Sequence, residues 1–151
     1  MISAGYIADY GFDMIDSFDT DNILFSVLNS NVELKTLLTG GIYPQGERPL
    51  NSNREDICVN TINLTQEYIP QSGTSNVNIY VADKKLKIEG QEQYIPNRKR
   101  LKLLAKATMQ ALSSGTEQGL QFWISNQNVI REQSINQHYI NLRIEWQNFK
   151  K

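Results

Sequence analysis

The end of the chain shows the clearest alternation of hydrophobic and polar residues. Within residues 138–149, apolar side chains stand at every second position from 140 to 146, and polar side chains follow each of them. The apolar residues are Ile140, Leu142, Ile144 and Trp146. Successive side chains of a strand point to opposite faces, so this pattern predicts a strand with one face in the core. We expect it to be central to a sheet.

Other segments carry strand patterns of different quality. Residues 76–81 alternate, with Val77, Ile79 and Val81 on one face. Residues 56–64 place apolar side chains on both faces, which predicts a strand that is covered on both sides. Residues 122–130 predict another strand, and Ile42 begins a very short one before a loop rich in proline and glycine. We also expect both tryptophans, Trp123 and Trp146, to lie in the core.

Three segments show helical spacing. The first starts at Thr20 or Asp21, either of which could cap it, and the second covers residues 32–38. We expect Gly40-Gly41 to close the second helix in the left-handed conformation. The third covers about residues 98–113 and has one apolar stripe. The stripe consists of Leu101, Leu104, Ala105, Thr108, Ala111 and Leu112.

The order of these segments predicts an α+β fold. Its antiparallel or mixed sheet has four to five strands, with two or three helices packed on one face. The length of 151 residues is enough for one domain with its own core. We assign residues 19–151 to this domain. Residues 1–18 are aromatic and aspartate-rich without a clear period, and we interpret them as an arm that docks on a neighbouring subunit.

The hydrophilic segment at residues 84–95 predicts an exposed, mobile hairpin or loop that becomes ordered on assembly. It begins a basic stretch of the chain. More than half of the 15 basic residues lie here: Lys84, Lys85, Lys87, Arg98, Lys99, Arg100, Lys102 and Lys106. The opening segment is acidic, with Asp9, Asp13, Asp16, Asp19 and Asp21. This asymmetry fits either pairing between subunits or two separate solvated faces.

Candidate chemistry is sparse. The single histidine, His138, and the single cysteine, Cys58, cannot form a zinc site or a convincing catalytic group, so we expect no enzyme activity, no metal and no cofactor. We interpret Cys58 as a small buried side chain and His138 as an ordinary residue at a strand edge. Glu55-Asp56 start a strand, and the sequence suggests no partner for them. The N-terminus lacks a basic region followed by an apolar run, which predicts synthesis in the cytosol, and no apolar stretch is long enough to cross a membrane.

Several short motifs follow one another along the sequence in a characteristic order. They are Leu34-x-x-Leu37-Leu38-x-Gly40-Gly41-Ile42-Tyr43-Pro44, Arg48-Pro49, Glu55-Asp56-Ile57-Cys58-Val59-Asn60, Pro70-Gln71-Ser72-Gly73 and Asn76-Val77-Asn78-Ile79-Tyr80-Val81. With the helix before them and the helix and two strands after them, they resemble the tail terminator (tail-completion) proteins of tailed bacteriophages. The resemblance covers most of the chain from about residue 20.

The resemblance implies a structural virion protein at the junction of neck and tail, assembled in the cytoplasm of the bacterial host. It implies a homo-oligomeric ring, commonly a hexamer, that caps the tail tube, faces the neck or connector and lets the genome pass without sequence-specific binding. The candidate interface residues are Tyr6, Tyr10, Phe12, Tyr43, Pro44, Arg48, Lys84, Lys85, Lys87, Tyr94, Arg98, Lys99, Arg100 and Lys102.

Other functions remain open at this point. A different head–tail connector, adaptor or neck subunit fits the same pattern. A nucleic-acid-binding module could use the basic helix at residues 98–106, since it concentrates positive charge. An enzyme would need a site that the sequence does not reveal.

Overall fold

The computed structural model describes residues 14–67, 70–113 and 119–149, and it confirms the predicted α+β class. The helices are α1 (Ser17–Asn29), α2 (Val32–Leu37) and α3 (Arg98–Leu112). The strands are β2 (Ile42–Pro44), β3 (Ile57–Leu64), β4 (Gln71–Ala82), β5 (Lys84–Ile88), β6 (Gln91–Ile95), β7 (Leu120–Glu132) and β8 (Gln137–Asn148).

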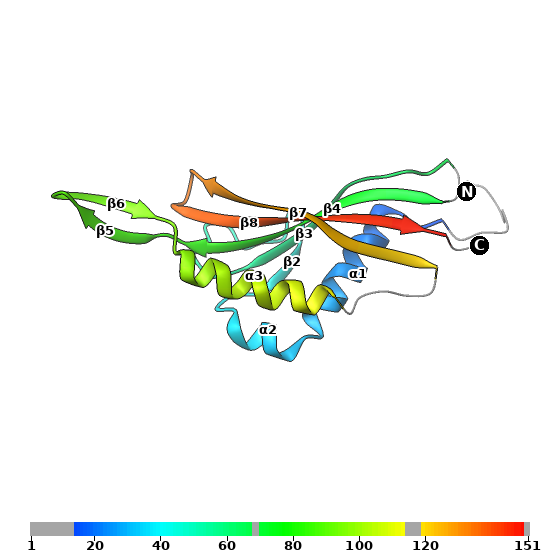
Figure 1. The fold of residues 1–151 in the computed structure, drawn as a ribbon, viewed down its shortest axis with the longest axis horizontal. Coiled ribbons are helices and arrows are strands. Elements are labelled where there is room, and N and C mark those ends of the chain that lie inside the picture. Colours follow the sequence, from blue (N-terminus) through cyan, green and yellow to red (C-terminus); the bar gives the residue numbers. More distant parts are fainter. Residues whose placement is uncertain (1–13, 68–69, 114–118, 150–151) are drawn as a thin grey trace.

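Five strands form one mixed sheet in the order β2-β3-β4-β8-β7. β2 runs parallel to β3, and the other neighbours are antiparallel. The strand with the clearest alternation, β8, lies between β4 and β7, as predicted. β5 and β6 make a separate hairpin that extends away from the body of the molecule, while the three helices lie on one side of the sheet (Figure 1).

The core lies between the helices and one face of the sheet. The predicted inward residues of β4 and β8 are buried, and so is the whole predicted stripe of α3. Trp146, the largest buried side chain, packs on Phe122 and donates a hydrogen bond from Nε1 to Ser75 Oγ at 2.8 Å. Period-two and helical patterns therefore identified the two surfaces that form this core.

The face of the sheet away from the helices differs from the prediction. Ile62 of β3 is half exposed and Trp123 of β7 is 44% exposed, so neither residue is in the core. The predicted cover on both faces of β3 was wrong because all three helices pack on the other face (Figure 1). A bulge between Thr61 and Asn63 also interrupts the alternation of β3.

Two helix boundaries also differ from the prediction. Asp16, not Thr20 or Asp21, caps α1, and its side chain forms a reciprocal capping box with Asp19. α2 ends at Leu37 because Leu38 is extended, so no left-handed glycine closes it. Gly40 has a different role: an added Cβ would lie 1.9 Å from Asp56 Oδ1, so only glycine allows this approach.

Candidate interaction surfaces

The β5–β6 hairpin has two unlike faces. Its register places Lys84 opposite Ile95, Leu86 opposite Gln93 and Ile88 opposite Gln91, so these six residues share one face. Leu86 is 44% exposed and Ile88 is 40% exposed. This face is apolar and amide-rich, and we call it the apolar hairpin face.

The opposite face of the hairpin is charged. Lys85 pairs with Tyr94 and Lys87 pairs with Glu92, while Lys85 Nζ also lies 3.6 Å from Glu92 Oε1. Both partners of this ion pair are more than half exposed, so it contributes little to stability. The predicted interface residues of the hairpin are therefore divided, with Lys84 on the apolar face and Lys85, Lys87 and Tyr94 on the charged face.

The start of α3 carries a column of exposed cations. Asn97 caps the helix by accepting a hydrogen bond from the backbone N–H of Arg100 at 3.2 Å. Arg98, Lys102 and Lys106 follow one another at four-residue spacing and are exposed. Lys99 is exposed beside them. The first turn contains no acidic residue, although the helix dipole favours negative charge there. The cations therefore add to the positive end of the helix dipole, and no acidic side chain in the first turn offsets them.

Arg100 points away from this column and into the molecule. Its Nε–H donates to Glu55 Oε2 at 2.7 Å, and its Nη2 donates to Glu55 Oε1 and, at 2.8 Å, to the backbone oxygen of Leu37. Hydrogen bonding to Glu55 raises the pKa of Arg100 above its ordinary value. The fork joins α3, the end of α2 and the segment before β3.

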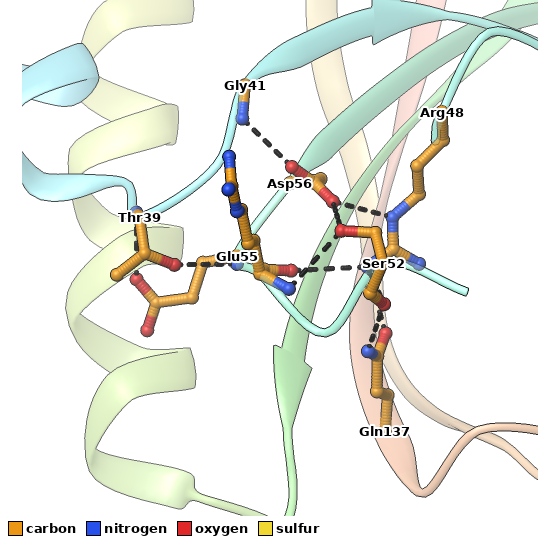
Figure 2. Close-up of polar contacts among 8 residues, drawn as sticks. Thr39, Gly41, Arg48, Ser52, Glu55, Asp56 and Gln137 are labelled. Atoms are coloured by element: carbon orange, nitrogen blue, oxygen red, sulfur yellow. Dashed lines mark hydrogen bonds and ion pairs between the residues drawn. The ribbon is translucent and has the colours of Figure 1, made fainter. Parts of the chain in front are cut away.

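Arg48 is engaged internally as well. Its Nε–H donates to Asp56 Oδ2 at 2.8 Å, and its Nη2 donates to Gln137 Oε1 at 2.9 Å. Asp56 also accepts hydrogen bonds from Ser52 Oγ at 2.6 Å and from the Gly41 N–H at 2.9 Å (Figure 2). We call Glu55, Asp56, their partners Arg48, Ser52 and Arg100, and Gln137, which bonds to Arg48 and to the Ser52 backbone, the acidic clamp. Sequence patterns did not reveal the clamp, since Arg100 comes from a helix 45 residues after Glu55 and Arg48 approaches Asp56 only through the fold of the loop between them.

The remaining predicted interface residues fall in two groups. Tyr43 and Pro44 lie on β2 and are partly buried, next to the loop that carries Arg48. Tyr6, Tyr10 and Phe12 lie outside the described residues. The interface role of these five residues stays a prediction, as does that of the basic residues.

The uncovered face of the sheet carries a row of asparagines that sequence reasoning did not single out. Asn141 Nδ2 donates to Asn76 Oδ1 at 2.9 Å and to Asn78 Oδ1 at 2.8 Å, and Asn60 pairs with Asn76 on the next strand. The asparagines at alternate positions of the strands could have indicated this row from the sequence. The row makes the centre of this face polar, with Arg143 of β8 in register with Asn76 as the charged residue beside it.

A shallow hollow of about 360 Å³ borders this row and includes Arg48, Cys58 and Tyr80. The Arg48 guanidinium lies 4.0 Å from the centre of the Tyr80 ring. Burial raises the pKa of the Cys58 thiol to about 11 and that of the Tyr80 hydroxyl to about 12. Cys58 is therefore a neutral thiol at physiological pH, only partly buried rather than in the core as expected.

His138 Nδ1 lies 2.6 Å from Asp83 Oδ1, at the point where β4 ends and the hairpin begins. Within the described ranges, no group of three or more His, Cys, Asp or Glu side chains is placed to hold a metal ion. No helix in the described part of the chain is long and apolar enough to cross a membrane.

Comparisons with known proteins give a distant structural likeness. No protein-family model matches the chain, and no curated protein matches it. The chain is similar to a chain in the solved structure titled "Virion of native gene transfer agent (GTA) particle", with 12% sequence identity and a TM-score of 0.47. The match covers 87% of this chain and 94% of that chain. At this identity and TM-score, we take no function from the likeness.

Proposed function

We propose that this protein is a structural subunit of a phage-type virion, a ring-forming tail terminator that joins the tail to the head-proximal neck. The specific role comes from the resemblance of the sequence from about residue 20 onward. The structural observation that carries an assembly function is the β5–β6 hairpin, which extends from the body and leaves apolar side chains in solvent.

An isolated two-stranded hairpin is marginally stable in water. Among the described residues, no helix or second sheet lies over the apolar hairpin face, and Leu86 and Ile88 remain substantially exposed. Contact with another subunit would bury this face and stabilise the hairpin. A head-to-tail contact of this kind, repeated by rotation, closes into a ring.

The uncovered sheet face supports the same function. Its asparagine row offers many hydrogen-bonding groups without net charge, and Trp123 lies exposed on the same face. Such a surface suits static contact with another protein, because its amide groups can pair without the cost of removing charges from water. A different head–tail connector or neck subunit would use these surfaces in the same way.

Nucleic-acid binding is a second candidate, favoured by the exposed column Arg98, Lys102 and Lys106. Binding to phosphates through three or four cations would weaken steeply as salt is raised. This candidate gives no role to the apolar hairpin face.

Light scattering at low and high salt, with and without double-stranded DNA, tests the proposal. We expect a closed oligomer near six copies, the number implied by the resemblance, with a mass that DNA does not change. A monomer that binds DNA in a salt-dependent manner would replace the proposal by the second candidate.

The variant Leu86→Asp with Ile88→Asp sharpens the test. Both side chains lie outside the core, so the fold should be retained, while charges on the apolar hairpin face should abolish the oligomer. The matched control is Val32→Asp with Leu50→Asp, which adds the same charges at two other exposed apolar positions. Equal loss of association in both double variants would show that the hairpin is not the contact.

A further inference from the structure

A second apolar surface lies between α3 and β7. It is a groove of about 460 Å³ whose apolar lining includes Leu101, Ala105, Met109, Val129 and Ile140. Val129 is 57% exposed although it points to the helix side of the sheet, where its partner Ile140 is buried. Three cations, Arg98, Lys102 and Lys106, also line the groove. The groove is thus apolar with a positively charged rim.

The groove is open along the outer edge of β7. β7 is the last strand of the sheet, and among the described residues no strand pairs with that edge. Beyond the bulge between Ile124 and Asn126, its residues are exposed on both faces of the sheet. An extended segment could therefore enter the groove from this side.

The first thirteen residues of the chain, which lie outside the described part, match the groove in sequence. Every even position from 2 to 12 is apolar: Ile2, Ala4, Tyr6, Ala8, Tyr10 and Phe12. The odd positions include Asp9 and Asp13. Between residues 2 and 13, Ile7 is the one apolar side chain at an odd position. The segment contains no lysine or arginine. Within residues 2–13, this period of two would give an extended chain one apolar side and another side that carries both aspartates.

We propose that residues 1–13 of one copy bind in the groove between α3 and β7 of a neighbouring copy. The even-numbered side chains would enter the groove, and Asp9 and Asp13 would lie along the rim formed by Arg98, Lys102 and Lys106. The contact rests on the proposed function, since it requires that copies of the chain associate.

The position of Ile15 favours a neighbour over the arm's own groove. Its N–H donates to Gln71 Oε1 at 2.9 Å, and Gln71 lies in register with Asn148 and, through it, with Leu120 at the start of β7. The groove begins near Gln127, about 23 Å further along β7 at roughly 3.3 Å per residue.

The two aspartates of the same copy cannot cover that distance. Asp9 lies six residues before Ile15, so it reaches at most about 22 Å, and Asp13 reaches about 7 Å. The segment that could reach its own groove, residues 1–8, contains no acidic residue. Complementary charge therefore selects the groove of another copy.

Charge reversal in the full chain tests the contact. One variant carries Asp9→Lys with Asp13→Lys, and the other carries Lys102→Glu with Lys106→Glu. Each alone should associate about tenfold more weakly in sedimentation equilibrium, because like charges then meet at the rim. An equimolar mixture should regain the original association, since each arm then meets a groove of opposite charge.

The control is Lys35→Glu with Arg54→Glu, which makes the same change in charge at exposed positions away from the groove. It should leave association unchanged. If only a single chain carrying all four reversals recovers, and the mixture does not, the arm occupies its own groove and the proposal is overturned. Unchanged association of the Lys102→Glu, Lys106→Glu variant also overturns it.

These outcomes separate the arm contact from the proposed function. If Leu86→Asp with Ile88→Asp abolishes the oligomer while the charge reversals have no effect, the ring proposal stands and the arm contact fails. If the unaltered chain stays monomeric at every concentration, both fail.

Discussion

The segment at residues 48–56 and the β5–β6 hairpin both contain arginine or lysine beside glutamate or aspartate, yet the fold treats their charges in opposite ways. In the acidic clamp, Asp56 is 1% exposed and accepts three hydrogen bonds from Gly41, Arg48 and Ser52. In the hairpin, Lys85 and Glu92 lie 3.6 Å apart and remain mostly in water. Charges of the first kind hold the fold, and those of the second kind remain available to a partner.

The difference follows from the elements that surround each pair. The clamp lies where β2, β3 and α3 meet, so its two carboxylates are largely out of water and each is paired with an arginine. The hairpin stands away from the sheet, so its charges keep their hydration (Figure 1). Substitutions made separately in the clamp and in the hairpin test this difference.

Asp56→Asn should have the largest effect. The neutral amide cannot match all three donors and leaves Arg48 without its anion, so the free energy of unfolding should fall by about 3 kcal/mol. Urea unfolding followed by circular dichroism measures the loss.

The matched change in the hairpin is Glu92→Gln, which removes an exposed ion pair and should cost less than about 0.5 kcal/mol. A similar cost for both variants would contradict the distinction between the clamp and the hairpin.

Gly40→Ala should cost about 2 kcal/mol, because the new Cβ would collide with the Asp56 carboxylate and the Glu55 backbone oxygen. Thermal and urea unfolding should both report the loss. Gly90→Ala in the hairpin turn is the comparison: Gly90 has φ of +81° and no atom within 4 Å of the added Cβ, so its cost of about 1 kcal/mol comes from the backbone alone. If Gly40→Ala costs no more than Gly90→Ala, the close approach to the clamp is not what requires glycine.

Glu55→Gln should cost about 1 to 2 kcal/mol. The effect is smaller than that of Asp56→Asn because the Arg100 side chain is 30% exposed and water can replace part of the lost pairing. Urea unfolding of Glu55→Gln and Asp56→Asn, measured side by side, shows which variant loses more free energy of unfolding. A larger loss for Glu55→Gln would mean that burial does not determine the strength of the two ion pairs.

The pH dependence of stability should show no contribution from Cys58 and Tyr80 near neutral pH. Burial raises the pKa of Cys58 from 9.0 to about 11 and that of Tyr80 from 10.0 to about 12, so the folded state holds both protons more tightly than the unfolded state. The free energy of unfolding should therefore fall as the pH rises from about 9 to about 12.

Cys58→Ser should remove the part of this decline that begins near pH 9, as measured by urea unfolding at several pH values. The alkylation rate of Cys58 in the folded chain should likewise rise only above pH 10. A thiol that reacts at pH 8 as fast as in the unfolded chain would contradict the raised pKa.

Much of the fold could be predicted from residue patterns. The alternation in β8 and β4 and the stripe of α3 gave the core, because these periods are local properties of the chain. Trp123 was misplaced since it follows Phe122, and the pattern alone did not show which of the two neighbours faced inward.

The candidate site was less accessible to sequence reasoning. Glu55 had no predicted partner because Arg100 comes from a helix that only the tertiary fold brings beside it, and Asp56 had none because its partner Arg48 lies in a loop without a regular pattern. Arg48 and Arg100 were grouped with the interface residues for the same reason. The two faces of the hairpin, by contrast, depend on a register that the sequence left open, although the hairpin itself was predicted.

The most direct test is the mass in solution of the unaltered chain and of Leu86→Asp with Ile88→Asp, measured by light scattering beside their urea midpoints. We predict a closed oligomer near six copies for the unaltered chain, and a monomer that still unfolds cooperatively, at a lower midpoint because the stabilising contact is lost, for the variant. An oligomer that survives the two substitutions, or an unaltered chain that is monomeric at every concentration, would contradict assembly through the hairpin.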